Sequence, residues 1–124
     1  MALADLTLSE RVTLVSLARI VIRADGKIST REAAAMGELA EAVGPARFVE
    51  AIEAAREQAP SAEDARRCAA AVTDPTTRRL IYRLVHYMAN SDGMSPNELE
   101  ELLWLAALWE LPVDPVTLVL PPGA

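Results

Sequence analysis

Two short acidic stretches of this 124-residue chain contain the residue types that a cation site would use. The first, ADGKISTRE, contains Asp25 and Glu32, and the second, SDGMSPNE, contains Asp92 and Glu98. In each stretch an Asp-Gly pair precedes a serine that is followed three residues later by the glutamate. Carboxylates that meet can hold a hard divalent cation, whereas carboxylates that stay apart serve in turns and helix caps.

The same residues have an ordinary structural interpretation. An Asp-Gly pair is a common turn, because Asp accepts local amide hydrogen bonds and Gly adopts positive φ. Ser29 with Glu32, and Ser95 with Glu98, fit the capping box, in which serine and glutamate satisfy two backbone amides at the start of a helix. The residue pattern therefore leaves two interpretations open: caps and turns alone, or caps and turns that also form a site.

Neither stretch alone supplies enough ligands for calcium. An EF-hand loop places acids at several alternating positions across twelve residues, whereas ADGKISTRE offers one Asp and a Glu seven residues later. Two stretches that face each other offer four carboxylates and loop carbonyls, which suits Ca²⁺, Mg²⁺ or Mn²⁺. Zinc is disfavoured, because Cys68 and His86 lie outside any ligand-spaced cluster.

Helix signals place both stretches between helices. The apolar residues are mainly Ala, Leu and Val, and Ala and Leu are strong helix formers. Capping, Gly and Pro signals predict six helices, at about residues 8–22, 30–43, 45–59, 62–73, 75–89 and 96–110. We therefore expect an all-α fold, a single small bundle of six or seven helices over residues 1–112, followed by a Pro-rich C-terminal tail over residues 113–124.

The bundle is expected to contain two helix-loop-helix pseudo-repeats. The serines of the two stretches lie 66 residues apart, as do the glutamates, whereas the aspartates lie 67 apart. The second loop is therefore one residue shorter. Each loop follows a hydrophobic helix and precedes an Ala/Leu-rich one, so the halves look related. Packing with pseudo-twofold symmetry would bring the two loops near each other.

The paired stretches, with the endings LAEAVG and LAALWELP of the helices that follow them, resemble the signature of TerB-like domains. This is the small helical domain of tellurite-resistance TerB proteins, also found at the N-terminus of a membrane-anchored DnaJ-type co-chaperone. The resemblance covers about residues 8–112. It implies an all-helical bundle with no established catalytic activity, linked to chemical-stress responses and membrane-associated complexes.

The resemblance also implies that the motif acids cluster and bind a metal ion. They correspond here to Asp25, Glu32, Asp92 and Glu98. The chain departs from the family pattern at Met94, where an acidic or polar residue is usual after Asp-Gly, and in the shorter second loop. Both departures affect the ligand geometry of that loop.

Charge and composition narrow the range of partners. The formal net charge is −6, and residues 88–124 contain six acids and no Lys or Arg, which repels nucleic-acid phosphates. The first ten residues hold an Asp and a Glu and lack a basic segment, which argues against a signal peptide. The longest charge-free apolar stretch, residues 102–109, is far shorter than the ~20 residues that span a bilayer. We expect a cytoplasmic protein without direct membrane insertion.

A protein partner or a second copy is expected to contact the helix at 96–110. Trp104, Leu108 and Trp109 are either core residues or part of this surface, because a small bundle need not cover every face of so apolar a helix. With no nucleophile-base or cofactor pattern, we expect a non-enzymatic interaction or sensor domain. The alternatives are a purely structural adaptor or dimerisation module, and a metal-dependent enzyme that uses the four carboxylates and a bound water.

Overall fold

The structure, a computed structural model, describes residues 3–23, 29–91 and 93–122, and these ranges contain helices but no strand. A short 3-10 helix, η1 (Leu3–Asp5), is followed by α1 (Leu8–Ile22), α2 (Thr30–Val43), α3 (Pro45–Gln58), α4 (Ala62–Ala71), α5 (Pro75–Ala89) and α6 (Pro96–Leu108). The predicted all-α helical bundle is confirmed. None of its described helices combines the length and apolar character needed to cross a bilayer.

Two helices end two residues earlier than the sequence predicts. α4 ends at Ala71, because Val72 is already extended ahead of Asp74 and Pro75. α6 ends at Leu108, where the Trp109 N–H closes the last turn and Glu110 takes a positive φ of 53°. In both cases the capping geometry rather than the apolar pattern sets the end of the helix.

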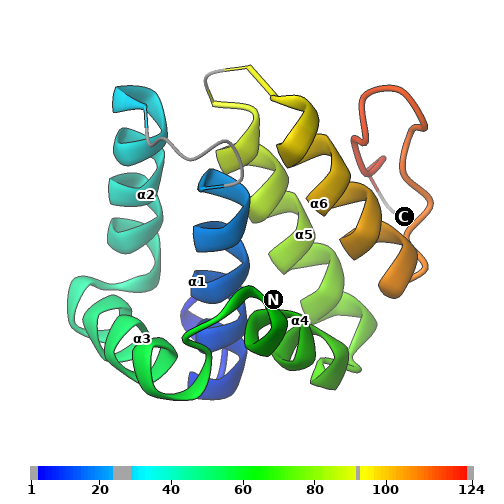
Figure 1. The fold of residues 1–124 in the computed structure, drawn as a ribbon. Coiled ribbons are helices and arrows are strands. Elements are labelled where there is room, and N and C mark those ends of the chain that lie inside the picture. The colour runs from blue at the N-terminus through cyan, green and yellow to red at the C-terminus, as the bar shows by residue number, and fades with distance from the viewer. Residues whose placement is uncertain (1–2, 24–28, 92, 123–124) are drawn as a thin grey trace.

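α1 forms the centre of the bundle. It packs against α3, α4, α5 and α6, and Figure 1 shows it between the other helices. Its buried residues lie on nearly every face, including Val12, Leu14, Leu17, Ala18 and Val21. A helix that is apolar all round belongs inside a core, and α1 has this position.

The two pseudo-repeats correspond to α1 with α2 and to α5 with α6. Their first helices, α1 and α5, pack against each other, and α2 also packs against α5. The N-terminal ends of α2 and α6 lie at one end of the bundle, while α3 and α4 cover the opposite end (Figure 1). The topology therefore brings the two predicted cap motifs to the same end of the molecule.

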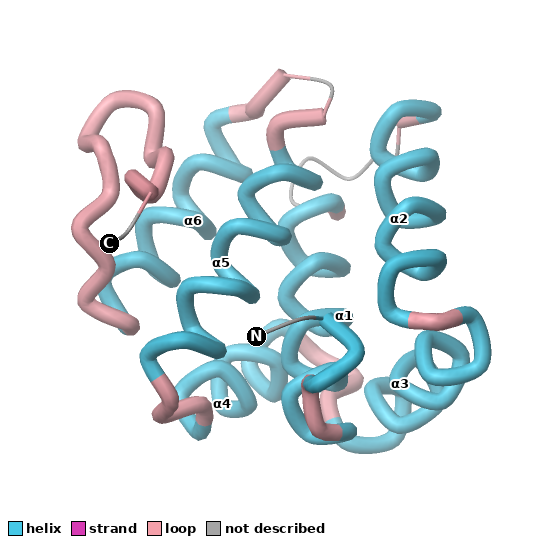
Figure 2. The backbone as a smooth tube through the Cα atoms, turned by 180° about the vertical axis from the view of Figure 1, so that it is seen from behind, coloured by secondary structure: helices cyan, strands magenta, loops and turns pink. Residues whose placement is uncertain are grey.

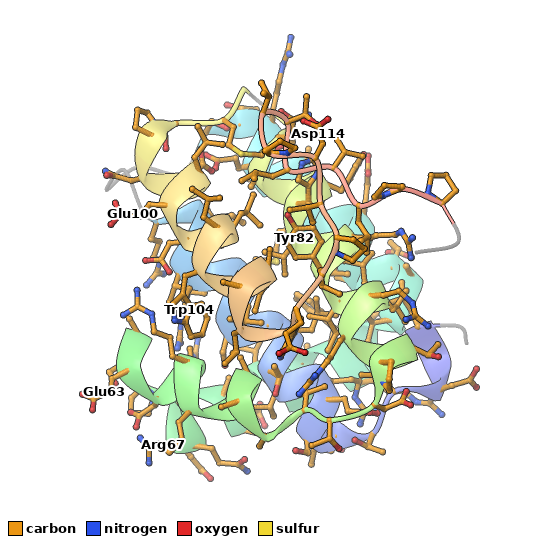
Figure 3. The ribbon with its side chains drawn as sticks, turned by 90° about the vertical axis from the view of Figure 1, so that its right-hand side faces the viewer. Glu63, Arg67, Tyr82, Glu100, Trp104 and Asp114 are labelled. Carbon is orange, nitrogen blue, oxygen red and sulfur yellow. The ribbon has the colours of Figure 1, made fainter. Side chains whose placement is uncertain are left out.

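The segment after α6 folds back against the bundle, and Figure 2 shows it along one edge. The Tyr82 hydroxyl donates a hydrogen bond to the Leu118 carbonyl at 2.6 Å, and Leu118 and Leu120 are buried. In Figure 3 Tyr82 points from α5 toward this segment. Nε2 of the half-buried His86 lies 3.1 Å from the Thr117 carbonyl. The Pro-rich segment, expected as a tail, is packed as far as Leu120, and Arg83 donates a hydrogen bond to the Pro121 carbonyl.

α6 buries Trp109 within the chain. This side chain is 3% exposed, and its indole N–H donates to the Ala69 carbonyl at 2.9 Å. The prediction that Trp109 belongs to a partner surface is therefore wrong, because α4 and the core cover the ring. Trp104 and Leu108 are half-buried, and the Arg66 guanidinium lies 5.4 Å from the Trp104 ring centre, on the side of α6 that faces α4 (Figure 3). The large apolar residue that α6 exposes most is Leu103, at 51%.

Candidate metal centre

Three helices begin with the same capping box. The Ser29 N–H donates to Glu32 Oε1 at 2.9 Å at the start of α2, and the Ser95 N–H donates to Glu98 Oε1 at 2.9 Å at the start of α6. The N–H of each glutamate in turn donates to the serine hydroxyl. Thr7 and Glu10 repeat the arrangement at α1. The predicted cap function of Ser29, Glu32, Ser95 and Glu98 is confirmed.

Burial distinguishes two of these three glutamates. Glu32 is 4% exposed and Glu98 is 2% exposed, whereas Glu10 is only half-buried. Glutamate is almost never fully buried unless it is paired, because an ionised carboxylate loses its hydration inside a protein. Glu10 shows that a capping box does not require burial. The positions of Glu32 and Glu98 therefore need a further explanation.

The side chains of Glu32 and Glu98 lie near each other, because Glu32 affects the pKa of the Glu98 carboxyl. Burial raises the pKa of Glu98; the Ser95 hydrogen bonds lower it, and Glu32 raises it further. Glu98 Oε2 is buried and receives no hydrogen bond from any described residue. Two adjacent buried carboxyls need either a proton between them or a cation beside them.

The described residues supply only part of a cation shell. Within those ranges, no group of three or more His, Cys, Asp and Glu side chains is arranged to hold a metal ion. Glu32 and Glu98 thus offer two carboxylates, and a hard cation would complete its shell with backbone carbonyls and water. The predicted ligands Asp25 and Asp92 lie outside the described residues. Beside Asp92, Gly93 has a φ of 79°, which fits the predicted Asp-Gly turn.

The spacing of the apolar residues in the sequence already indicates that these two glutamates are buried. Glu32 continues the buried stripe of α2, where Ala35, Leu39 and Val43 follow at helical spacing. Glu98 likewise heads a buried stripe with Leu102 and Leu105 in α6. A glutamate in line with an apolar stripe is expected to face the core.

Comparison with known proteins supports the fold. No protein-family model matches the chain, and no curated protein matches it. Among solved structures, the chain is similar to a crystal structure of a protein of unknown function from Porphyromonas gingivalis W83. The two share 22% sequence identity over 90% of this chain and 85% of that chain, with a TM-score of 0.69. This likeness shows that the helical arrangement is shared, and it carries no information on function.

Proposed function

We propose that this chain is a non-enzymatic, TerB-like sensor or interaction domain that takes up one divalent cation between its two halves. The observation that carries the proposal is the burial of both Glu32 and Glu98, with Glu32 raising the pKa of Glu98, although Glu10 shows that the same cap works half-exposed. Asp25 and Asp92 complete the proposed ligand set. The cation is a hard one, Ca²⁺, Mg²⁺ or Mn²⁺, because every side chain in that set offers carboxylate oxygen.

A bound cation would explain the two carboxyls chemically. Its charge offsets the repulsion between Glu32 and Glu98, and it gives Glu98 Oε2 a partner. Each carboxylate belongs to the first turn of a different helix, α2 or α6. Cation binding would therefore join the two pseudo-repeats at one end of the bundle, and this change in stability is what a partner protein would sense.

Binding fits the geometry better than catalysis. The two carboxyls are at most 4% exposed, which suits an ion and leaves little room for a substrate to approach. The enzyme alternative would need an open cleft beside them. Because its two acidic stretches resemble those of TerB-like domains, the proposed role is in the response to tellurite or other chemical stress, and the proposed location is the cytoplasm.

A thermal melt with and without metal tests the proposal. The wild type should melt at a higher temperature with millimolar CaCl₂, MgCl₂ or MnCl₂ than with EDTA, because a ligand that binds only the native state stabilises it, by about 2.7 kcal/mol at a hundred times Kd. Glu98→Gln keeps an oxygen for the Ser95 amide but should lose the metal response. Glu10→Gln, the matched change at the third capping box, should keep it. An unchanged wild-type melting temperature with all three metals would remove the proposal.

An adaptor role is the second candidate, and the exposure of Leu103 favours it. This residue is 51% exposed on α6, beside the half-buried Trp104. An apolar side chain in this position can anchor a protein partner or a second copy. The adaptor role is compatible with cation binding, because Leu103 lies more than a helical turn beyond Glu98.

A further inference from the structure

A hollow of about 290 Å³ opens between α1, α2 and α3, and neither Glu32 nor Glu98 lines it. Its wall is apolar and is formed by Val15, Met36, Phe48, Ile52 and Ala55. Ligand pockets typically combine such an apolar wall with a few polar groups that orient the ligand, and they start at about 300 Å³. The hollow therefore has the size of a small-ligand pocket.

Three arginines supply the charge around this hollow: Arg19 and Arg23 from α1, and Arg56 from α3. No Asp or Glu is among the described residues that line it. The ion pairs found within the described ranges use Arg11, Arg66 and Arg67 instead. Arg19 donates to the Ala59 carbonyl, while Arg23 and Arg56 are exposed. The hollow is thus locally basic on a chain whose formal net charge is −6.

An ordinary role accounts for part of this arrangement. Arginines near the C-terminal ends of helices interact favourably with the helix dipole, and Arg19 and Arg56 lie in the last turns of α1 and α3. That role does not require the arginines to converge on one apolar hollow. A second hollow shares Arg19 and Arg23 and reaches Ser61 and Ala62 at the N-terminus of α4, whose helix dipole is also positive there.

We infer that the hollow binds a small amphiphilic carboxylate, with its hydrocarbon part against the apolar wall and its carboxylate on Arg19, Arg23 and Arg56. Guanidinium groups present paired N–H donors that match a carboxylate, and they hold it more firmly than a single ammonium does. The volume suits a short chain or a single ring, since it lies at the lower limit for ligand pockets. Because neither Glu32 nor Glu98 lines the hollow, this inference does not rest on the cation proposal.

Calorimetric titration with octanoate tests this inference. Octanoate should bind the wild-type chain, and octanol, which has the same chain length and no charge, should bind at least about tenfold more weakly because it lacks the charged hydrogen bonds. Arg23→Gln and Arg56→Gln each change an exposed residue and should lower octanoate affinity, to about a tenth when combined. Arg31→Gln, an exposed arginine on α2 outside the lining, is the matched control and should leave the affinity unchanged.

Three results would overturn the inference. These are an absence of octanoate binding at millimolar concentration, equal affinity for octanoate and octanol, or an affinity that the double variant does not lower. Binding of an acidic amphipathic peptide without binding of octanoate would also overturn it, because the hollow would then belong to a protein interface. Circular dichroism of each variant confirms that it is folded before its affinity is compared.

Discussion

Glu32 and Glu98, which are 66 residues apart in the sequence, are both buried, and Glu32 raises the pKa of the Glu98 carboxyl. Each glutamate also accepts the backbone N–H of the serine that caps its helix. One oxygen of each carboxyl thus serves a local cap, and the two glutamates come near each other only when the fold brings the N-terminal ends of α2 and α6 to the same end of the bundle. The site is therefore a property of the folded domain rather than of either loop.

The pKa of Glu98 predicts a pH dependence of stability. Because the folded pKa lies above the ordinary value of 4.5, the native state holds its proton over a pH range in which the unfolded chain has lost it. The free energy of unfolding should fall as pH rises through this range in EDTA. Glu98→Gln should remove this fall. The free energy of unfolding of the variant should therefore increase relative to that of the wild type as pH rises from 4 to 7. Urea unfolding at several pH values measures the difference.

The matched change Glu10→Gln serves as the control for that experiment. Glu10 makes the same capping box but is half-buried and outside the pair, so its substitution shows what the loss of a capping carboxylate alone does to stability. Asp74 and Asp114 have lowered pKa values, so their stabilisation is lost as pH falls, which is the opposite direction. If the free energy of unfolding changes with pH in the same way for the wild type and for Glu98→Gln, that result would contradict a proton held between Glu32 and Glu98.

Local signals predicted the helices and caps well, because their causes lie within a few residues. Ser29 and Ser95 cap α2 and α6 as expected, and Gly44 ends α2. The burial of Trp109 depends on the Ala69 carbonyl of α4, which no pattern near residue 109 indicates. Packing of the C-terminal segment against Tyr82 likewise rests on contacts between distant parts of the chain. Both features depend on packing between distant parts of the chain, which local sequence patterns do not predict.

Tyr82→Phe should loosen the C-terminal segment. The substitution removes the hydrogen bond to the Leu118 carbonyl and should cost about 1 kcal/mol of unfolding free energy. Burial raises the pKa of Tyr82 to about 12, so the wild type should lose stability as pH rises from 10 through 12, and the variant should lose less. Hydrogen exchange of the Leu118 and Val119 amides measures the loosening directly. Unchanged exchange would contradict a stabilising role for this contact.

Substitutions on α6 separate its core face from its exposed face. Trp109→Ala should cost about 3–5 kcal/mol, because it leaves a cavity and removes the donor to the Ala69 carbonyl. Leu103→Glu should change stability by less than about 0.5 kcal/mol, because the site is half exposed. If α6 holds a second copy, light scattering should show a lower mass for Leu103→Glu than for the wild type. If the wild type and Leu103→Glu are both dimers of equal mass, Leu103 does not belong to that interface.

Gly44 is predicted to be required for the α2–α3 turn. Its φ of 105° is unfavourable for other residues, so Gly44→Ala should cost about 1–3 kcal/mol from backbone strain, although its Cβ would meet no atom within 4 Å. Gly37→Ala is the control, since Gly37 is exposed inside α2 and the same change there should stabilise by about 0.5–1 kcal/mol. Chemical denaturation of both variants compares the two effects, and equal effects would contradict the strain argument.

Direct titration of the cation tests the central claim most closely. Isothermal titration calorimetry of the EDTA-treated, dialysed protein with CaCl₂, MgCl₂ and MnCl₂ measures affinity and stoichiometry for the wild type, Glu32→Gln, Glu98→Gln and Glu10→Gln. We predict one site per chain for at least one cation, lost in the Glu32 and Glu98 variants and retained in the Glu10 variant. No binding of any of the three cations by the wild type, or equal binding by all four proteins, would contradict it.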